Sequence, residues 1–191
     1  KRQRGKAYWL ITSACDFYSA EAIWWLTLTS APGSRPIEKS WNALRTRMDR
    51  TTRQDIIDWL LNEKRKGFSK KEQRYCLEFY VGKDPNALVE YKYIAIKTSE
   101  GNGVYHMFLF GDMFPASWLR YWWVKYHCDS KMLKIERLKT TSGDRDRLRK
   151  YALAQYAAGQ DQFVRLSHSN DILFLKQVKV YQALKDDYGW K

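Results

Sequence analysis

The chain has 191 residues, of which 45% are hydrophobic and 16% aromatic, so it is long enough for one domain with a sizeable apolar core. Its 34 Lys and Arg outnumber 21 Asp and Glu, and the formal net charge of +13 favours a polyanionic partner. Three cysteines without a CxxC pair exclude a disulfide framework and a thiolate zinc site, and no apolar run reaches the roughly 18 residues of a membrane span.

The first residues of the chain and its cysteines predict where the protein is located and whether it is part of a longer polypeptide. The apolar run before Cys15 is too short and too often interrupted by polar residues for a signal peptide. Unpaired cysteines are typical of a reducing compartment, so we expect a cytoplasmic protein without a membrane association. Because no initiator Met is present, we expect 1–191 to be a single domain taken from a longer polypeptide.

The first predicted elements are a strand and a helix. The sequence IWWLTLTS over 23–30 is rich in β-branched and aromatic residues and precedes the turn sequence APGS, which predicts a buried strand. A helix is expected to begin near Pro36, because apolar side chains then recur at helical spacing: Ile37, Trp41, Leu44 and Met48. Residues 51–82 are predicted to form a helical insertion of one or two helices around the basic sequence KRKGFSKK.

The middle of the chain predicts a hairpin, a helix and a further strand. Strands over 90–98 and 104–110 are joined by SEGNG, in which Asn-Gly is a hairpin signal. Pro115 begins a helix with a broad apolar face, and the alternating sequence MLKIERL predicts a strand over 132–138. With a C-terminal helix near 173–184, the pattern indicates an α+β fold in which helices pack against an antiparallel sheet.

A basic helix predicted over 144–160 carries two tyrosines that are candidate nucleophiles. A phenol held by a rigid helix among cations can attack a phosphodiester, although both rings could instead only pack. Residues five apart on a helix are separated by about 140°, so one ring at most can be active. Small neighbours and Gly159 leave room for a nucleotide beside Tyr156, which makes Tyr156 the preferred nucleophile and Tyr151 the alternative.

His106 is the candidate metal ligand, although a buried structural role is the alternative. By strand alternation it shares a face with Val104 and Phe108. A phenol that attacks phosphate near neutral pH needs a cation to polarise the phosphoryl oxygens, and a histidine with carboxylate oxygens suits Mg²⁺ or Mn²⁺. Other histidines lie at a helix end, His127, and in a predicted loop, His168.

The carboxylate that would complete the metal site depends on the hairpin loop. Glu100 is the nearest in sequence, with Glu78 and Glu90 as alternatives. A three-residue loop over 101–103 would pair Thr98 with His106 and keep Glu100 on its face, whereas a two-residue loop would reverse the face.

Three segments, taken in order, resemble the HUH superfamily of rolling-circle replication initiators and relaxases, especially the replication proteins of archaeal plasmids and viruses. WLTLTS over 25–30 is similar to the first motif of the family, GVYHMFLFG over 103–111 to its histidine strand, and KYALAQYAAGQ over 150–160 to its tyrosine helix. The resemblance implies a sheet of about five antiparallel strands, HUH or ferredoxin-like, with a metal site on one face.

The resemblance also implies an activity. The enzyme would nick single-stranded DNA at a replication origin, hold a 5′-phosphotyrosine, release a 3′-hydroxyl and later rejoin the ends. Tyr156 would be the nucleophile and His106 a metal ligand. The DNA-binding positions would be Thr27, Thr29, Arg145, Arg149, Lys150 and Gln160. A host helicase or polymerase would be a further partner.

The sequence departs from the family pattern at two positions. The second histidine of the family falls on Phe108, so a metal would need Glu100, Gln160 or water instead. The lysine that often follows the nucleophile by three residues falls on Gly159, so another cation would have to neutralise the phosphate. The alternative function is a non-catalytic module that binds single-stranded nucleic acid on the same fold.

Overall fold

The structure of the chain is a computed structural model. It describes residues 10–12, 14–18, 22–30, 36–62, 70–98, 103–127, 133–137 and 165–168, together with isolated positions between 143 and 187. Within these residues, no helix combines the length and the apolar character needed to cross a membrane.

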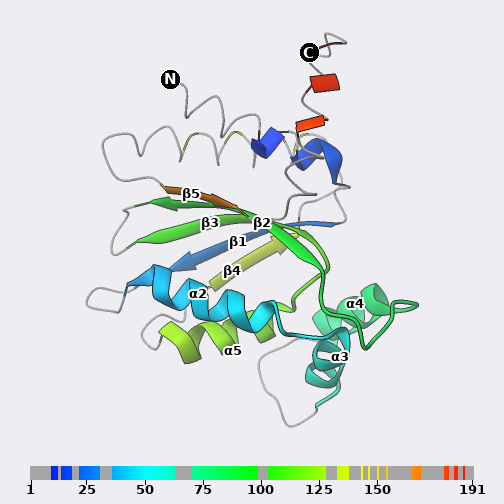
Figure 1. Cartoon of the computed structure of the whole chain (residues 1–191). Coiled ribbons are helices and arrows are strands. Elements are labelled where there is room, and N and C mark those ends of the chain that lie inside the picture. Colours follow the sequence, from blue (N-terminus) through cyan, green and yellow to red (C-terminus); the bar gives the residue numbers. More distant parts are fainter. Residues whose placement is uncertain are drawn as a thin grey trace.

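One antiparallel sheet lies at the centre of the fold (Figure 1). Its strands follow the order β4-β1-β3-β2-β5, so the two strands of the outer edges are the shortest. The strands are β1 (Ile23–Thr29), β2 (Tyr91–Thr98), β3 (Val104–Gly111), β4 (Leu133–Arg137) and β5 (Arg165–His168). The predicted α+β class and the first four strands are confirmed.

Two helices, α2 (Ile37–Met48) and α5 (Ala116–His127), cover one face of the sheet side by side (Figure 1). The apolar stripe predicted for the first of them is confirmed, because all four of its residues are buried. Pro36 precedes α2 at its N-cap. Two further helices, α3 (Arg53–Leu61) and α4 (Lys70–Tyr80), lie beyond one end of the sheet, where the sequence predicted one or two helices.

The two faces of the sheet bury separate apolar clusters, because neighbouring side chains of a strand point to opposite faces. On the helix-covered face, the even residues of β1 and the odd residues of β3 pack with α2 and α5; examples are Leu26 and Met107. On the other face, Trp25 and Phe108 pack with the helical segment that contains Ile11. The central strands therefore contribute to two cores at once.

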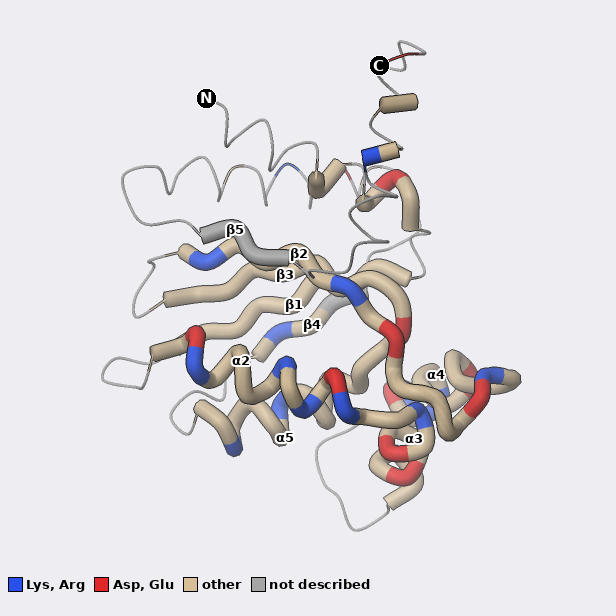
Figure 2. Tube along the Cα trace, in the orientation of Figure 1, with Lys and Arg blue, Asp and Glu red and all other residues tan. Residues whose placement is uncertain are grey.

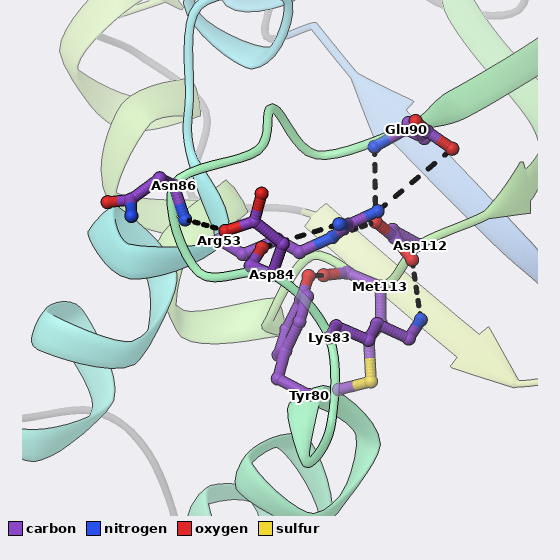
Figure 3. A network of polar contacts seen from close by, with 8 residues as sticks. All are labelled: Arg53, Tyr80, Lys83, Asp84, Asn86, Glu90, Asp112 and Met113. Carbon is purple, nitrogen blue, oxygen red and sulfur yellow. Dashed lines mark hydrogen bonds and ion pairs between the residues drawn. The ribbon is translucent and has the colours of Figure 1, made fainter.

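A polar cluster fastens the end of β3 to α3 and to the segment before β2 (Figure 3). The Asp112 carboxylate accepts hydrogen bonds from Arg53 Nε at 2.8 Å, from Lys83 Nζ at 2.6 Å and from the Glu90 N–H at 3.2 Å. Burial alone would raise the pKa of Asp112, but the hydrogen bonds from Lys83 and Arg53 outweigh it and lower the pKa below its ordinary value. The carboxylate therefore stays ionised while nearly buried.

The structure corrects two sequence expectations. Thr98 pairs with Val104, not with His106, because five residues, 99–103, connect the paired ends of β2 and β3. The other correction concerns the C-terminal part of the chain, where strand β5 had not been predicted and where His168 lies in that strand instead of a loop. The predicted helices near 144–160 and 173–184 lie almost wholly outside the described residues.

Candidate functional site

The site proposed from the sequence centres on one row of residues across the middle of the sheet. Thr27 of β1 pairs with His106 of β3 on one side and with Lys134 of β4 on the other. His106 pairs in turn with Ile96 of β2. Because residues directly opposite each other in an antiparallel sheet project to the same side, a hydroxyl, an imidazole and an ammonium group share one face.

The immediate surroundings fix the orientation of the His106 ring. Its Nδ1 lies 3.5 Å from Thr27 Oγ1, at the outer limit of a hydrogen bond. Trp25 stacks against the ring with the planes inclined by 18° and the centroids 5.7 Å apart. The side chain is only 5% exposed, so His106 is held as a buried imidazole with a defined plane.

Phe108 marks the main departure from the family pattern. Its ring is 1% exposed and packs edge-on against Trp25, 4.7 Å away between centroids. It thus belongs to the apolar cluster on the same face as His106. In the part of the chain that the structure describes, no group of three or more His, Cys, Asp or Glu side chains is arranged to hold a metal ion.

Lys134 is a candidate that sequence reasoning missed. It is exposed and lies beside Thr27, about 10 Å from His106 because two strand spacings separate them. The sequence MLKIERL predicted the strand, but only the pairing with β1 reveals which strand and which row Lys134 joins. No signal in the sequence alone would have placed it next to the first motif.

The remaining sequence candidates are distributed unevenly over the structure. Thr29 lies on the His106 face at the end of β1, where it pairs with Val104. Lys150 is helical and exposed. Six candidates lie outside the described residues: Glu100, Arg145, Arg149, Tyr151, Tyr156 and Gln160. The alternative carboxylates, Glu78 and Glu90, lie on α4 and before β2 and do not join the row.

His127 has a structural environment. It is fully buried at the end of α5, and its Nδ1 and Nε2 atoms lie 2.8 Å and 2.9 Å from the hydroxyl oxygens of Ser40 and Ser30. Trp123 stacks on the ring with 4.6 Å between centroids. Both nitrogens are thus used to connect α5 with α2 and with the residue after β1, on the side of the sheet away from His106.

Comparison of the chain with protein-family models, with curated proteins and with solved structures gave no match.

Proposed function

We propose that this chain is the endonuclease domain of a rolling-circle replication initiator of the HUH type, which nicks and rejoins single-stranded DNA through a tyrosine. The observation that carries the proposal is the Thr27–His106 pair. Two motifs that lie 79 positions apart in the sequence meet in adjacent strands, with their polar side chains on one face. The order of the motifs and the antiparallel sheet are those that the resemblance implies.

The proposed first step is a transfer of one phosphoryl group. The phenolic oxygen of Tyr156 attacks the phosphorus of the scissile phosphodiester as the phenol loses its proton. The bond between phosphorus and the 3′-oxygen breaks, and that oxygen leaves as a 3′-hydroxyl after protonation. The 5′-phosphate remains bonded to Tyr156, and attack by a 3′-hydroxyl reverses the step and rejoins the strand.

The residues of the row have separate roles in this proposal. Thr27 would orient the His106 ring through Nδ1, and Nε2 would be the atom that binds a metal ion, in the way that partners of metal-bound histidines fix the ring. Mg²⁺ or Mn²⁺, with Glu100 as a further ligand, would supply polarisation of the phosphoryl oxygens. Lys134 would hold a neighbouring phosphate of the strand as a point charge.

The test uses a randomised library of single-stranded DNA labelled at the 3′ end, because the origin sequence is not known in advance. After incubation with Mn²⁺, label that migrates with the denatured protein reports the 5′-phosphotyrosine. We expect this adduct to be lost in Tyr156→Phe and retained in Tyr151→Phe. Sequencing of the attached strands would then give the cleavage sequence.

A matched pair of variants tests the role of the row. Thr27→Val should lower adduct formation by about 10- to 100-fold, the usual effect of removing a partner of a metal-bound histidine. Thr29→Val makes the same change on the same face without a neighbouring imidazole, so its effect should be smaller. Equal effects would contradict the role of Thr27 as the partner that orients His106, and retention of the adduct in Tyr156→Phe would remove Tyr156.

A second function is favoured by one observation, the burial of Phe108 where the family has its second histidine. A chain without that ligand could bind single-stranded nucleic acid on the same face without cutting it. In that case no metal would yield an adduct, and binding would be insensitive to chelator. The logarithm of affinity would still fall with the logarithm of salt, by about 0.7 for each phosphate neutralised.

A further inference from the structure

The outer surface of the helical layer, on the side of the sheet away from His106, carries several positively charged side chains. Helices α2 and α5 lie side by side there, and the Ser40 hydroxyl donates to the Tyr126 carbonyl oxygen at 3.2 Å. Figure 2 shows Lys and Arg along both helices. We give the name α2–α5 basic surface to Lys39, Arg47, Arg50 and Lys125. On an ideal helix the first three project toward α5 or toward solvent, and Lys125 contacts the same Trp122 ring as Arg47.

The acidic residues of α2 are turned away from this surface. Glu38 forms an ion pair with Lys97 of β2, and Asp49, just after the helix, accepts a hydrogen bond of 2.6 Å from the Tyr91 hydroxyl of the same strand. On an ideal helix, Glu38 and Asp49 project on the β2 side, opposite the side that meets α5. The potential of the α2–α5 basic surface is therefore not neutralised by carboxylates of its own helix.

An aromatic side chain holds two of the cations in place. The guanidinium carbon of Arg47 lies 4.6 Å from the centre of the Trp122 ring, and Lys125 Nζ lies 4.8 Å from it. Tyr126 stacks on the same indole at 5.7 Å. Cation–π contacts of this kind reduce the freedom of long side chains, so the two helices present fixed charges across their junction.

We propose that the α2–α5 basic surface binds the phosphate backbone of double-stranded DNA. Charge complementarity carries this assignment, because clustered Lys and Arg on one face are the electrostatic footprint of a nucleic-acid site. Binding of single strands relies on aromatic faces that accept bases, whereas Trp122 is already covered by two cations and a tyrosine. The exposed aromatic side chain of α5, Tyr121, packs against Trp59 and edge-on against Trp122. The α2–α5 basic surface therefore offers mainly charge, which suits the regularly spaced phosphates of a duplex.

The dimensions agree with this partner. Twelve helical residues span about 18 Å. A duplex carries about one charge for every 1.7 Å of its axis, so several phosphates lie within reach of the α2–α5 basic surface. Because the helical layer and His106 lie on opposite faces of the sheet, this contact does not depend on the nicking chemistry proposed above.

The experiment measures binding of the full chain to a duplex of arbitrary sequence, in the presence of chelator so that no metal-dependent step contributes. Lys39→Glu/Arg50→Glu should weaken binding about tenfold or more and should make the salt dependence shallower by roughly 0.9 per lost phosphate contact. The matched control is Lys70→Glu/Lys71→Glu at the start of α4, where both residues are exposed. Both double variants lower the net charge of +13 by the same four units, and the control should bind almost normally.

Three results would overturn the inference. Equal losses of duplex affinity in both double variants would show that binding depends on the overall charge and not on the α2–α5 basic surface. An equally strong loss for a single strand of the same length would contradict the duplex as partner. A loss of binding to vesicles of anionic lipid, with duplex binding unchanged, would assign the surface to a membrane. Adduct formation on short single strands should be unchanged in Lys39→Glu/Arg50→Glu, so failure of the nicking proposal and failure of this one give different results.

Discussion

Gly111 is a single residue on which the junction between β3 and its neighbours depends. Its φ of 103° is one that side chains of L-residues rarely adopt, and an added Cβ would lie 2.6 Å from the Glu90 carbonyl oxygen. Gly82 also has a positive φ, 78°, but a Cβ there meets nothing within 4 Å. A substitution at Gly82 therefore tests backbone strain alone, whereas one at Gly111 tests strain and steric overlap together.

We predict that Gly111→Ala lowers the free energy of unfolding by about 3 kcal/mol, since the overlap adds to a strain of about 1 kcal/mol or more. Gly82→Ala should cost only the strain, about 1 kcal/mol. Urea unfolding followed by tryptophan fluorescence measures both. Equal losses would mean that the backbone near Glu90 relaxes to accept the methyl group.

Asp112 makes the folding stability of the chain depend on pH. Because its pKa in the folded chain lies below the ordinary value, the contribution is complete above the ordinary pKa of an aspartate and is lost as pH falls through the lowered pKa. Asp112→Asn leaves Arg53 and Lys83 without their shared carboxylate, which should cost about 3 kcal/mol at neutral pH.

The difference in unfolding free energy between Asp112→Asn and the unchanged chain should shrink as the medium is acidified below about pH 4. Thermal unfolding at a series of pH values measures it. Asp58→Asn is the control, because Asp58 is exposed and contacts only Gln54 through its side chain among the described residues. A difference that stays constant with pH would show that Asp112 acts through shape alone.

At the scale of single elements, α3 begins with a reciprocal cap. The Asp55 N–H donates to Thr52 Oγ1 at 3.1 Å, and the Thr52 N–H donates to the Asp55 carboxylate at 2.9 Å. Two backbone N–H groups at the start of the helix are thereby given hydrogen-bond acceptors.

We predict that Thr52→Ala lowers the free energy of unfolding by about 1 kcal/mol. Thr46→Ala, inside α2, should instead raise the free energy of unfolding by roughly a few tenths of a kcal/mol, because Thr46 is exposed and alanine has the higher helix propensity. Denaturant unfolding of the two variants checks the pair. A loss of similar size in both would assign the effect at position 52 to something other than the cap.

Periodicity explains which elements could be predicted from the sequence. The spacing of apolar residues in α2, the β-branched and aromatic composition of β1, the hairpin signal before β3 and the alternation in β4 are local signals, and each predicted its element within a few residues. Strand β5 has four residues, RLSH, too few to show an alternation. The face of His106 followed from alternation alone.

The partners of each strand could not be predicted in the same way. Alternation does not say which strand lies beside which, so the Lys134–Thr27 pairing had no local signal. The pairing of Thr98 with Val104 depended on the length of the connection, which the Asn-Gly signal suggested to be shorter. For the candidate site, the position of each residue along its own strand could be predicted from the sequence. Which residues of different strands lie side by side could not.

At the scale of the whole molecule, the two apolar clusters are joined through shared strands. Ile11 is fully buried on the face of Phe108, and Leu44 of α2 is fully buried against the other face. Strands β1, β2 and β3 send alternate side chains into both clusters. Disruption of either cluster should therefore unfold the same three strands.

We predict that Ile11→Ala and Leu44→Ala each lower the stability of one common unfolding transition by about 2–5 kcal/mol. Calorimetry should give a single peak in both variants, and Phe17→Ala, at a side chain that is 45% exposed, should have a much smaller effect. Two separate peaks, with only one of them displaced in each variant, would contradict the coupling of the clusters.

The order of the strands also bears on self-association. An outermost strand presents unpaired backbone groups that can recruit a strand from another molecule, and proteins limit this risk with short, charged edges. The outermost strands of this sheet have five and four residues, and the sequence of β4, LKIER, places three charged residues among two apolar ones. The long apolar strands β1, β2 and β3 are paired on both sides. The edge-to-edge contacts that would favour aggregation are thus limited to two short strands, although the chain is rich in β-forming aromatic residues.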